Sequence, residues 1–248
     1  MSEKFLIHAA GDWGPEQIRS IWSPRPRQIP PSVAQKIESA WAEAMRRTDL
    51  KLFNGKMSRL ESWRLDGPEL ELILGPTEYK EFWGTNLMNP QLAEEFGPDV
   101  LSNALGISAI VQSSDGHLIF GRRTATVAFH AHRIHCFGGT VDDGRTDVFG
   151  EILRELEEEV GLARSDLRQI RCIGLDEDRA IRQPELMFHA QAFYSLNEIE
   201  KRLDAVEHSA IWSVPATRST VERAMQNEEL TPIAVAGLHL MLSQILEK

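Results

Sequence analysis

Carboxylates crowd one short run of this sequence. The stretch "DVFGEILRELEEEVG", residues 147–161, carries Glu151, Glu155, Glu158 and Glu159, and Arg154 is the only basic residue within it. On a helical wheel these glutamates share one face, where each pair of like charges at i,i+4 destabilises a helix by a few tenths of a kcal/mol. A solvated helix would normally carry lysines to relieve this repulsion. The run therefore indicates either a tolerated acidic face or a site for a cation.

The other face of the same run is apolar and predicts a helix that packs on a core. Gly161 suits the position just after the helix, and Asp147 suits the N-cap. Carboxylates at i, i+3 and i+4 on a rigid helix offer the oxygen ligands that Mg²⁺ prefers, with water and phosphate completing the octahedron. The run thus favours metal-assisted chemistry on a phosphate compound, and a merely solvated acidic face is the alternative. The apolar positions are Val148, Phe149, Ile152, Leu153, Leu156 and Val160.

Composition narrows the class of partner. The chain has 248 residues, 42% of them apolar, and a net charge of -10, which fits one large domain or two modest ones. Binding to nucleic acid as the main role is excluded, because it needs clustered Lys and Arg. No run approaches the ~18 apolar residues of a membrane span, and the first residues do not form a secretory signal. With two cysteines, Cys136 and Cys172, and no disulfide framework expected, we expect a cytoplasmic protein without a membrane partner.

The elements that must position the acidic helix are a mixture of strands and helices. They lack strict βαβ alternation, which favours the α+β class and an α/β/α sandwich. A new pattern begins near residue 104, with a hairpin over 107–123 around an "SSDG" turn. Before it, a helix over 32–47 follows a proline-rich stretch, and a short helix from Thr77 is expected to end at Gly84. Strands are predicted at 4–9, 56–65, 69–75, 133–139, 167–178, 184–195 and 210–216, and further helices at 89–99, 195–206, 217–226 and 231–248.

The acidic helix and the glycines before it resemble the Nudix box. That box reads Gly, five residues, Glu, seven residues, then Arg-Glu-apolar-any-Glu-Glu-any-Gly-apolar, and it marks hydrolases of nucleoside diphosphates linked to another moiety. Two departures stand in its first half: Arg145 replaces the glutamate, and one extra residue precedes Arg154. We expect Asp147 to take over the loop-holding task of the missing glutamate. The second half matches at every fixed position: Arg154, Glu155, Leu156, Glu158, Glu159, Gly161 and Leu162.

Segments outside the box narrow the resemblance. "LKLFNGKMSRLESW", "LGPTEYKEFWGTN" and "GRRTATVA" are similar to segments of the animal Nudix hydrolases that cleave UDP-glucose and UDP-galactose. The resemblance implies a smaller β-rich N-terminal domain, residues 1–104, packed on a Nudix α/β/α sandwich, residues 105–248. It also implies hydrolysis of a UDP-sugar to UMP and a sugar 1-phosphate, dependent on Mg²⁺ or on Mn²⁺ in its place.

The resemblance assigns roles to the helix residues. Glu155, Glu158 and Glu159 would hold the metal, and Arg154 would keep them in place by ion pairing. The glycine pair Gly138–Gly139 would lie against the substrate, although such a pair alone is a weak phosphate-loop signal. Two rivals stay open, namely a Nudix hydrolase of another nucleoside diphosphate derivative such as ADP-ribose, and a non-catalytic nucleotide-sugar-binding module. The oligomeric state stays undetermined.

Four further residues are candidates for substrate contact. Arg122 and Arg123 end the hairpin, and one of them could grip a diphosphate, although exposed arginines at strand ends are common. Glu185, near the start of a strand, is a metal ligand, a base or a surface glutamate. Asn86 could read the polar edge of a uracil, or cap the short helix. The histidines of "FHAHRIH", residues 129–135, lack a partner pair at zinc-ligand spacing, so a zinc site is not favoured.

Overall fold

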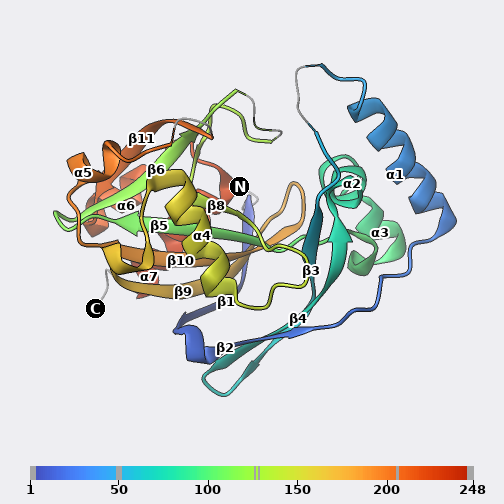
Figure 1. The fold of residues 1–248 in the computed structure, drawn as a ribbon, viewed down its shortest axis with the longest axis horizontal. Coiled ribbons are helices and arrows are strands. Elements are labelled where there is room, and N and C mark those ends of the chain that lie inside the picture. The colour runs from blue at the N-terminus through green and yellow to red at the C-terminus, as the bar shows by residue number, and fades with distance from the viewer. Residues whose placement is uncertain (1–3, 49–51, 126, 128, 205–206, 245–248) are drawn as a thin grey trace.

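The computed structural model describes residues 4–48, 52–125, 127, 129–204 and 207–244, and an eight-stranded mixed sheet forms its centre (Figure 1). The strand order is β1-β9-β10-β5-β6-β11, with β8 paired to β5 and β7 to β6. Strands β5 and β10 run parallel and the other pairs are antiparallel. The strands are β1 (Phe5–Trp13), β5 (Gly106–Gln112), β6 (His117–Arg123), β7 (Ile134–His135), β8 (Phe137–Thr140), β9 (Leu167–Asp178), β10 (Gln183–Ala192) and β11 (His208–Pro215).

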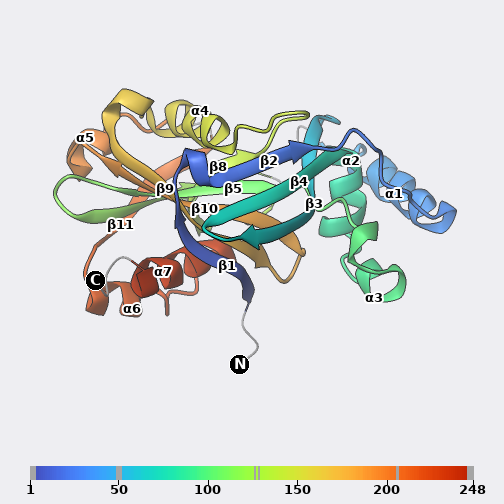
Figure 2. The same cartoon turned by 90° about the horizontal axis from the view of Figure 1, so that it is seen from below.

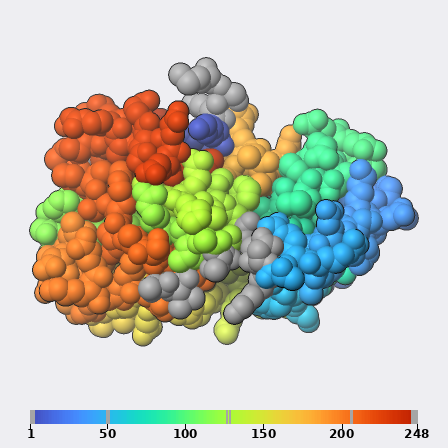
Figure 3. Space-filling view, turned by 90° about the horizontal axis from the view of Figure 1, so that it is seen from above, coloured from blue at the N-terminus to red at the C-terminus, as the bar shows by residue number. Residues whose placement is uncertain are grey.

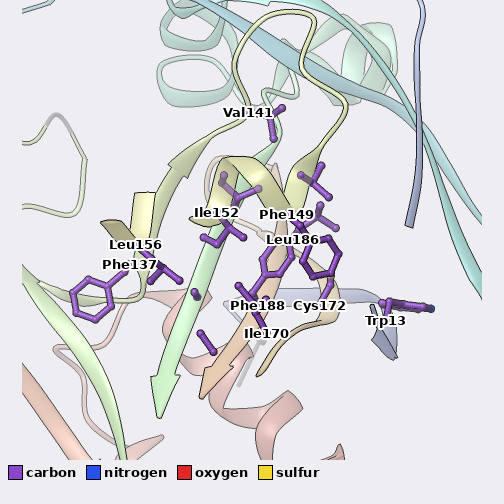
Figure 4. Close-up of a cluster of buried hydrophobic side chains, with 14 of the residues drawn as sticks. Trp13, Phe137, Val141, Phe149, Ile152, Leu156, Ile170, Cys172, Leu186 and Phe188 are labelled. Atoms are coloured by element: carbon purple, nitrogen blue, oxygen red, sulfur yellow. The ribbon is translucent and has the colours of Figure 1, made fainter. Parts of the chain in front are cut away.

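Helices cover both faces of this sheet (Figure 2). The acidic helix α4 (Val148–Val160) lies on one face, and α6 (Arg218–Ala224) and α7 (Pro232–Gln244) lie on the other. Under α4 the apolar stripe packs on sheet residues, with Phe149 edge-on to Phe188 at 5.1 Å between ring centroids (Figure 4). The short helix α5 (Leu196–Glu200) precedes β11. The predicted α+β class and α/β/α sandwich are confirmed.

The part of the chain between β1 and β5, named the N-terminal segment below, builds a second sheet of three strands in the order β2-β4-β3. These are β2 (Ile18–Trp22), β4 (Glu69–Glu78) and β3 (Lys56–Asp66), and the helices beside them are α1 (Pro31–Ala44), α2 (Tyr79–Phe82) and α3 (Leu92–Phe96). β2 was not predicted. β1 pairs with β9 in the large sheet, so the first strand belongs to the sheet that carries α4. The domain boundary near residue 104 stays a prediction.

Four predicted elements differ in the structure. The helix predicted over 89–99 is divided at Gly97 into α3 and a 3-10 turn over Pro98–Val100. The helix predicted from Thr77 begins at Tyr79, because β4 extends to Glu78, and it does not end at Gly84 but continues as a π-helical turn over Trp83–Leu87. Gly84 serves packing instead, because a Cβ there would lie 2.6 Å from Cα of Ile37 in α1. The strand predicted over 133–139 is two strands, β7 and β8, which pair with different neighbours.

The helix predicted over 195–206 is shorter than expected. It ends at Glu200, and the chain turns toward α4, where the N–H of Asp204 donates to the carbonyl of Glu159. The last residues of this prediction and of the one over 231–248 lie outside the described residues, as do Leu50 and Lys51 of one segment used for the family resemblance. No helix in the described part of the chain has the length and apolar character that crossing a bilayer requires.

Candidate active site

Helix α4 lies against the glycine pair of β8. The N–H of Gly138 donates to Oε2 of Glu159 over 2.8 Å. A side chain at Gly139 would place its Cβ 2.5 Å from Oε1 of Glu155. Gly138 has φ +151, and a Cβ there would lie 2.0 Å from the carbonyl oxygen of Ile107. The two glycines therefore allow the carboxylates of α4 to approach the strand closely.

Caps fix both ends of α4. Oδ1 of Asp147 accepts a hydrogen bond from the N–H of Gly150 at 2.9 Å, which confirms Asp147 as the N-cap. Gly161 is left-handed at φ 61, and the N–H of Leu162 donates to the carbonyl of Leu156. Because both ends are capped, the glutamates between them project from a rigid element.

Arg154 organises part of the carboxylate cluster. Its guanidinium lies 2.7 Å from Glu155, 3.0 Å from Glu158 and 3.5 Å from Glu151. The carboxylate of Glu158 is directed to this arginine, and its side chain is 59% exposed. Glu159, by contrast, is buried against β8. The three predicted metal ligands are therefore not equivalent: Glu155 and Glu159 face the glycine pair, and Glu158 lies on the solvent side.

Negative charge is crowded on the inner side of α4, where Glu155 and Glu159 lie. Burial raises the pKa of Glu155 to about 7, and the neighbouring charges of Glu159 and Glu158 add to this against the opposing effect of Arg154. Oε1 of Glu159 is buried 3.3 Å from Nε2 of His208 without a hydrogen bond from any described residue. A cation would relieve this arrangement, so the donor set fits Mg²⁺. Among the described residues, however, no three His, Cys, Asp or Glu side chains converge closely enough to form a complete metal site.

A cavity of about 550 Å³ opens beside the glycine pair. It lies where the N-terminal segment meets the large sheet, and Figure 3 shows the blue and teal atoms of that segment beside the lime-green atoms of the β6–β8 region. A larger hollow of about 680 Å³ along α1 lies away from the carboxylates. The wall of the 550 Å³ cavity includes Phe53, Tyr79, Phe82, Ser108, Arg123, Phe129, His130, His135, Gly138, Gly139, Thr140, Asp178, Gln183, Glu185 and Glu207.

The two adjacent arginines have different surroundings. Arg123 lines the cavity, and the charges of Glu207, Glu159 and Glu185 act on its buried guanidinium. Arg122 instead pairs with Glu229 through both terminal nitrogens, at 3.3 and 3.0 Å, on the exposed side of β6. Of the two candidates for phosphate contact, the fold brings only Arg123 to the cavity.

Glu185 is a buried carboxyl in the cavity wall. It lies at the start of β10 and accepts a hydrogen bond from the hydroxyl of Ser108. Burial raises its pKa to about 7, with a further contribution from the charge of Asp178. Asp176, opposite Glu185 in the sheet register, is fully buried without a hydrogen-bond partner for either oxygen among the described residues. Glu185 thus has the environment of a group that can exchange a proton near neutral pH.

Glu207 was not predicted as a site residue, and it lies in the wall of the 550 Å³ cavity. Burial is the main cause that raises the pKa of the Glu207 carboxyl, and the negative charge of Glu159 raises this pKa further. No motif surrounds Glu207 in the sequence. Only the return of the chain toward α4 before β11 brings this carboxyl to Glu159.

Asn86 has a structural role in place of the predicted contact with uracil. Its amide nitrogen donates to the carbonyls of Ile181 and Arg182, at 2.9 and 3.1 Å. Its Oδ1 accepts from the N–H of Asn103 at 3.1 Å, and the side chain is fully buried outside the cavity wall. These hydrogen bonds occupy the donors and the acceptor that a uracil would need. The predicted contact of Asn86 with the substrate is therefore wrong.

Comparison with known proteins supports the family resemblance. No family model matches the chain. Nudix hydrolase 9 of Arabidopsis thaliana is 25% identical, over 82% of this chain and 78% of its own. Uridine diphosphate glucose pyrophosphatase NUDT22 of Homo sapiens is 26% identical, over 91% of this chain and 87% of its own. The chain is a homologue of the Nudix hydrolases.

Among solved structures, a mutT/nudix family protein from Listeria innocua is similar with a TM-score of 0.46 and 20% identity, and it covers 58% of this chain and 94% of its own. The NUDT22 protein of Bos taurus is 24% identical over 91% of both chains. The similarity to named Nudix hydrolases and pyrophosphatases supports an enzyme of the Nudix hydrolase class.

The altered first half of the Nudix box has a structural explanation in this homologue. Arg145 is 68% exposed, and its Nε lies 4.0 Å from Glu151. Glu151 is buried, and its Oε2 accepts from the N–H of Asp142 at 3.3 Å. The loop before α4 is therefore held by Glu151 from within the helix and by Asp147 at its N-cap.

Proposed function

We propose that this Nudix homologue hydrolyses the diphosphate of a UDP-hexose to UMP and a hexose 1-phosphate in the presence of Mg²⁺. The observation that carries the proposal is the meeting of α4, the glycine pair and a cavity large enough for a nucleotide-sized ligand. The uridine preference rests on the relatives named for UDP-glucose, which match most of the chain.

Glu155 and Glu159 would hold the metal, with Glu158 and Glu207 as further carboxylates beside them. Bound Mg²⁺ supplies neutralisation of diphosphate charge and a lower pKa for a bound water. Arg154 keeps Glu155 and Glu158 from adopting other positions through its two short ion pairs.

The remaining steps fall to groups of the cavity wall. Arg123 offers a guanidinium to a phosphate oxygen, where its planar fork suits bidentate contact. The water oxygen attacks one phosphorus, and the bond from that phosphorus to the bridging oxygen breaks. The proton of the water passes to Glu185, whose pKa of about 7 suits a base at neutral pH. No covalent enzyme intermediate is needed.

The test is a substrate comparison with product chromatography. With Mg²⁺, we expect kcat/KM for UDP-glucose or UDP-galactose to exceed that for ADP-ribose at least tenfold, a difference of ~1.4 kcal/mol in transition-state binding. Equal or reversed values would reject the UDP-hexose preference and keep only the hydrolase class. Absence of turnover on every diphosphate tested would favour the non-catalytic binding module.

A further inference from the structure

One part of the cavity wall is polar and holds no group that contacts the substrate in the hydrolysis proposed above. Nε2 of His130 lies 3.0 Å from Oδ2 of Asp178, a carboxylate that is only 2% exposed. Gln183 is the register partner of Asp178 across the β9–β10 hairpin, and its side chain has no hydrogen bond to another described residue. All three residues line the cavity. We name them, His130, Asp178 and Gln183, the polar wall.

The backbone at His130 is held in an unusual conformation. His130 has φ 56 and His132 has φ 66, a left-handed region that non-glycine residues seldom adopt. Such conformations cost about 1–3 kcal/mol and persist only where the surroundings determine them. At His130 these surroundings are Asp178 and the ring of Phe129, 3.9 Å away between centroids. The loop is thus shaped so that an imidazole is presented at the cavity.

Asp178 is itself fixed by the turn that follows it. Its Oδ1 accepts from the N–H of Ala180 at 2.9 Å, and its carbonyl accepts from the N–H of Arg182 at 2.6 Å. Asn86 then holds the carbonyls of Ile181 and Arg182 from the N-terminal segment. Because these hydrogen bonds hold Asp178 in place, its carboxylate orients the imidazole of His130, whose second ring nitrogen can meet a ligand.

Different parts of the chain contribute different kinds of side chain to the cavity wall. The N-terminal segment contributes the aromatic rings of Phe53, Tyr79 and Phe82, which suit the faces of a nucleobase. The polar wall presents an imidazole nitrogen and an amide, which suit the alternating donors and acceptors of a polyhydroxyl ring. In the tautomer whose Nε2–H donates to the carboxylate of Asp178, Nδ1 is the acceptor that faces a ligand hydroxyl.

We propose that His130 and Gln183 bind hydroxyl groups of the sugar linked to the diphosphate, and that Asp178 is the positioning residue for His130. This assignment rests on the proposed function, because it needs a nucleoside diphosphate sugar in the cavity. It gives the β6–β7 loop and the β9–β10 hairpin the task of selecting a hydroxylated leaving group.

The test compares two substrates that differ only in this group. UDP-glucose carries the hydroxyls of the hexose, and the methyl ester of UDP has a methyl group in place of the hexose. His130→Asn keeps a residue that tolerates positive φ. We expect kcat/KM for UDP-glucose to fall at least tenfold, while kcat/KM for the methyl ester changes less than threefold. His132→Asn is the matched control, since His132 has the same backbone conformation but is exposed and outside the cavity wall, and it should leave both values unchanged.

Gln183→Ala provides a second variant whose backbone is an ordinary strand. It should also lower the ratio of the two kcat/KM values, by about threefold or more. Equal losses on both substrates in His130→Asn and Gln183→Ala would overturn the sugar assignment and leave the polar wall with a structural role. If the unaltered protein hydrolyses neither substrate, the proposed function fails, which is a separate outcome.

Discussion

At the scale of single residues, neighbouring glutamates of α4 have different environments. Glu159 is buried. Its Oε2 accepts a hydrogen bond from the N–H of Gly138, and its Oε1 has no hydrogen bond from a described residue. Glu158, one position earlier, is paired to Arg154 at the surface. The crowding of like charge is therefore concentrated between Glu155 and Glu159, where a cation would have most effect.

Replacing Glu159 by Gln tests this asymmetry. The amide oxygen can still accept from Gly138, but one negative charge is lost, so the metal-free protein should keep or slightly raise its melting temperature. Turnover with Mg²⁺ should fall roughly a hundredfold, or ~2.7 kcal/mol. Mg²⁺ should raise the melting temperature of the parent protein by mass action, and by less in the variant.

Glu157→Gln is the matched control for Glu159→Gln, because Glu157 is exposed on the same helix. Thermal melts with and without Mg²⁺, beside a turnover assay, give all the readouts. Similar behaviour of the two variants would contradict a metal role for Glu159.

The buried carboxyl of Glu185 predicts a pH dependence of stability. Its pKa is about 7 in the folded protein against an ordinary value of 4.5. The native state therefore binds more protons than the unfolded chain between these values, and the free energy of unfolding falls as pH rises from about 4.5 to about 7. At about 1.4 kcal/mol per pKa unit, Glu185 contributes about 3 kcal/mol to this fall. Urea denaturation of the metal-free protein at about pH 5 and pH 8 measures it.

Glu185→Gln should flatten that dependence, because the amide does not titrate. Glu155 is unchanged in the variant, so the difference between the two proteins isolates Glu185. An identical pH dependence in parent and variant would show that Glu185 titrates at its ordinary pKa.

At the scale of elements, the loop before α4 shows how a departure from the family pattern is accommodated. Arg145 occupies the place of a glutamate and is exposed, whereas Asp147 and the buried Glu151 make the hydrogen bonds that shape the loop. The carboxylates of α4 depend on these caps for their position along β8.

Asp147→Ala should lower the free energy of unfolding by ~1 kcal/mol through loss of the N-cap. Arg145→Ala should change it by less than ~0.5 kcal/mol, since an exposed pair contributes little. Turnover should stay within about tenfold of the parent in both variants. A collapse of turnover in Arg145→Ala with an unchanged urea midpoint would instead assign that arginine to the substrate.

At the scale of the whole molecule, the cavity depends on contacts between distant parts of the chain. Asn86 joins the N-terminal segment to the turn after β9 through two hydrogen bonds. That turn follows directly on Asp178, and the carboxylate of Asp178 lies 3.0 Å from the imidazole of His130. The N-terminal segment thereby positions the polar wall of His130, Asp178 and Gln183, to which it contributes no residue.

Asn86→Ala would leave two carbonyls and one buried N–H without partners, so we expect a loss of about 2–3 kcal/mol in the free energy of unfolding. kcat/KM for a UDP-hexose should also fall, because the polar wall is loosened. Asn89→Ala is the control, since the Asn89 amide donates to Gly84 within its own segment. Equal effects of the two substitutions on kcat/KM would contradict a role of the Asn86 hydrogen bonds in positioning the polar wall.

The sequence by itself determined the features that depend on local spacing. The amphipathic period placed α4, its caps followed from Asp147 and Gly161, and the hairpin over 107–123 followed from its turn. Tertiary structure decided which side chains meet. It separated Arg123 from Arg122, buried Asn86 among carbonyls, and brought Glu207 to Glu159 and His130 to Asp178. The physical reason is that periodicity reports the face of an element, whereas a contact between residues 48 positions apart or more depends on how the chain turns between elements.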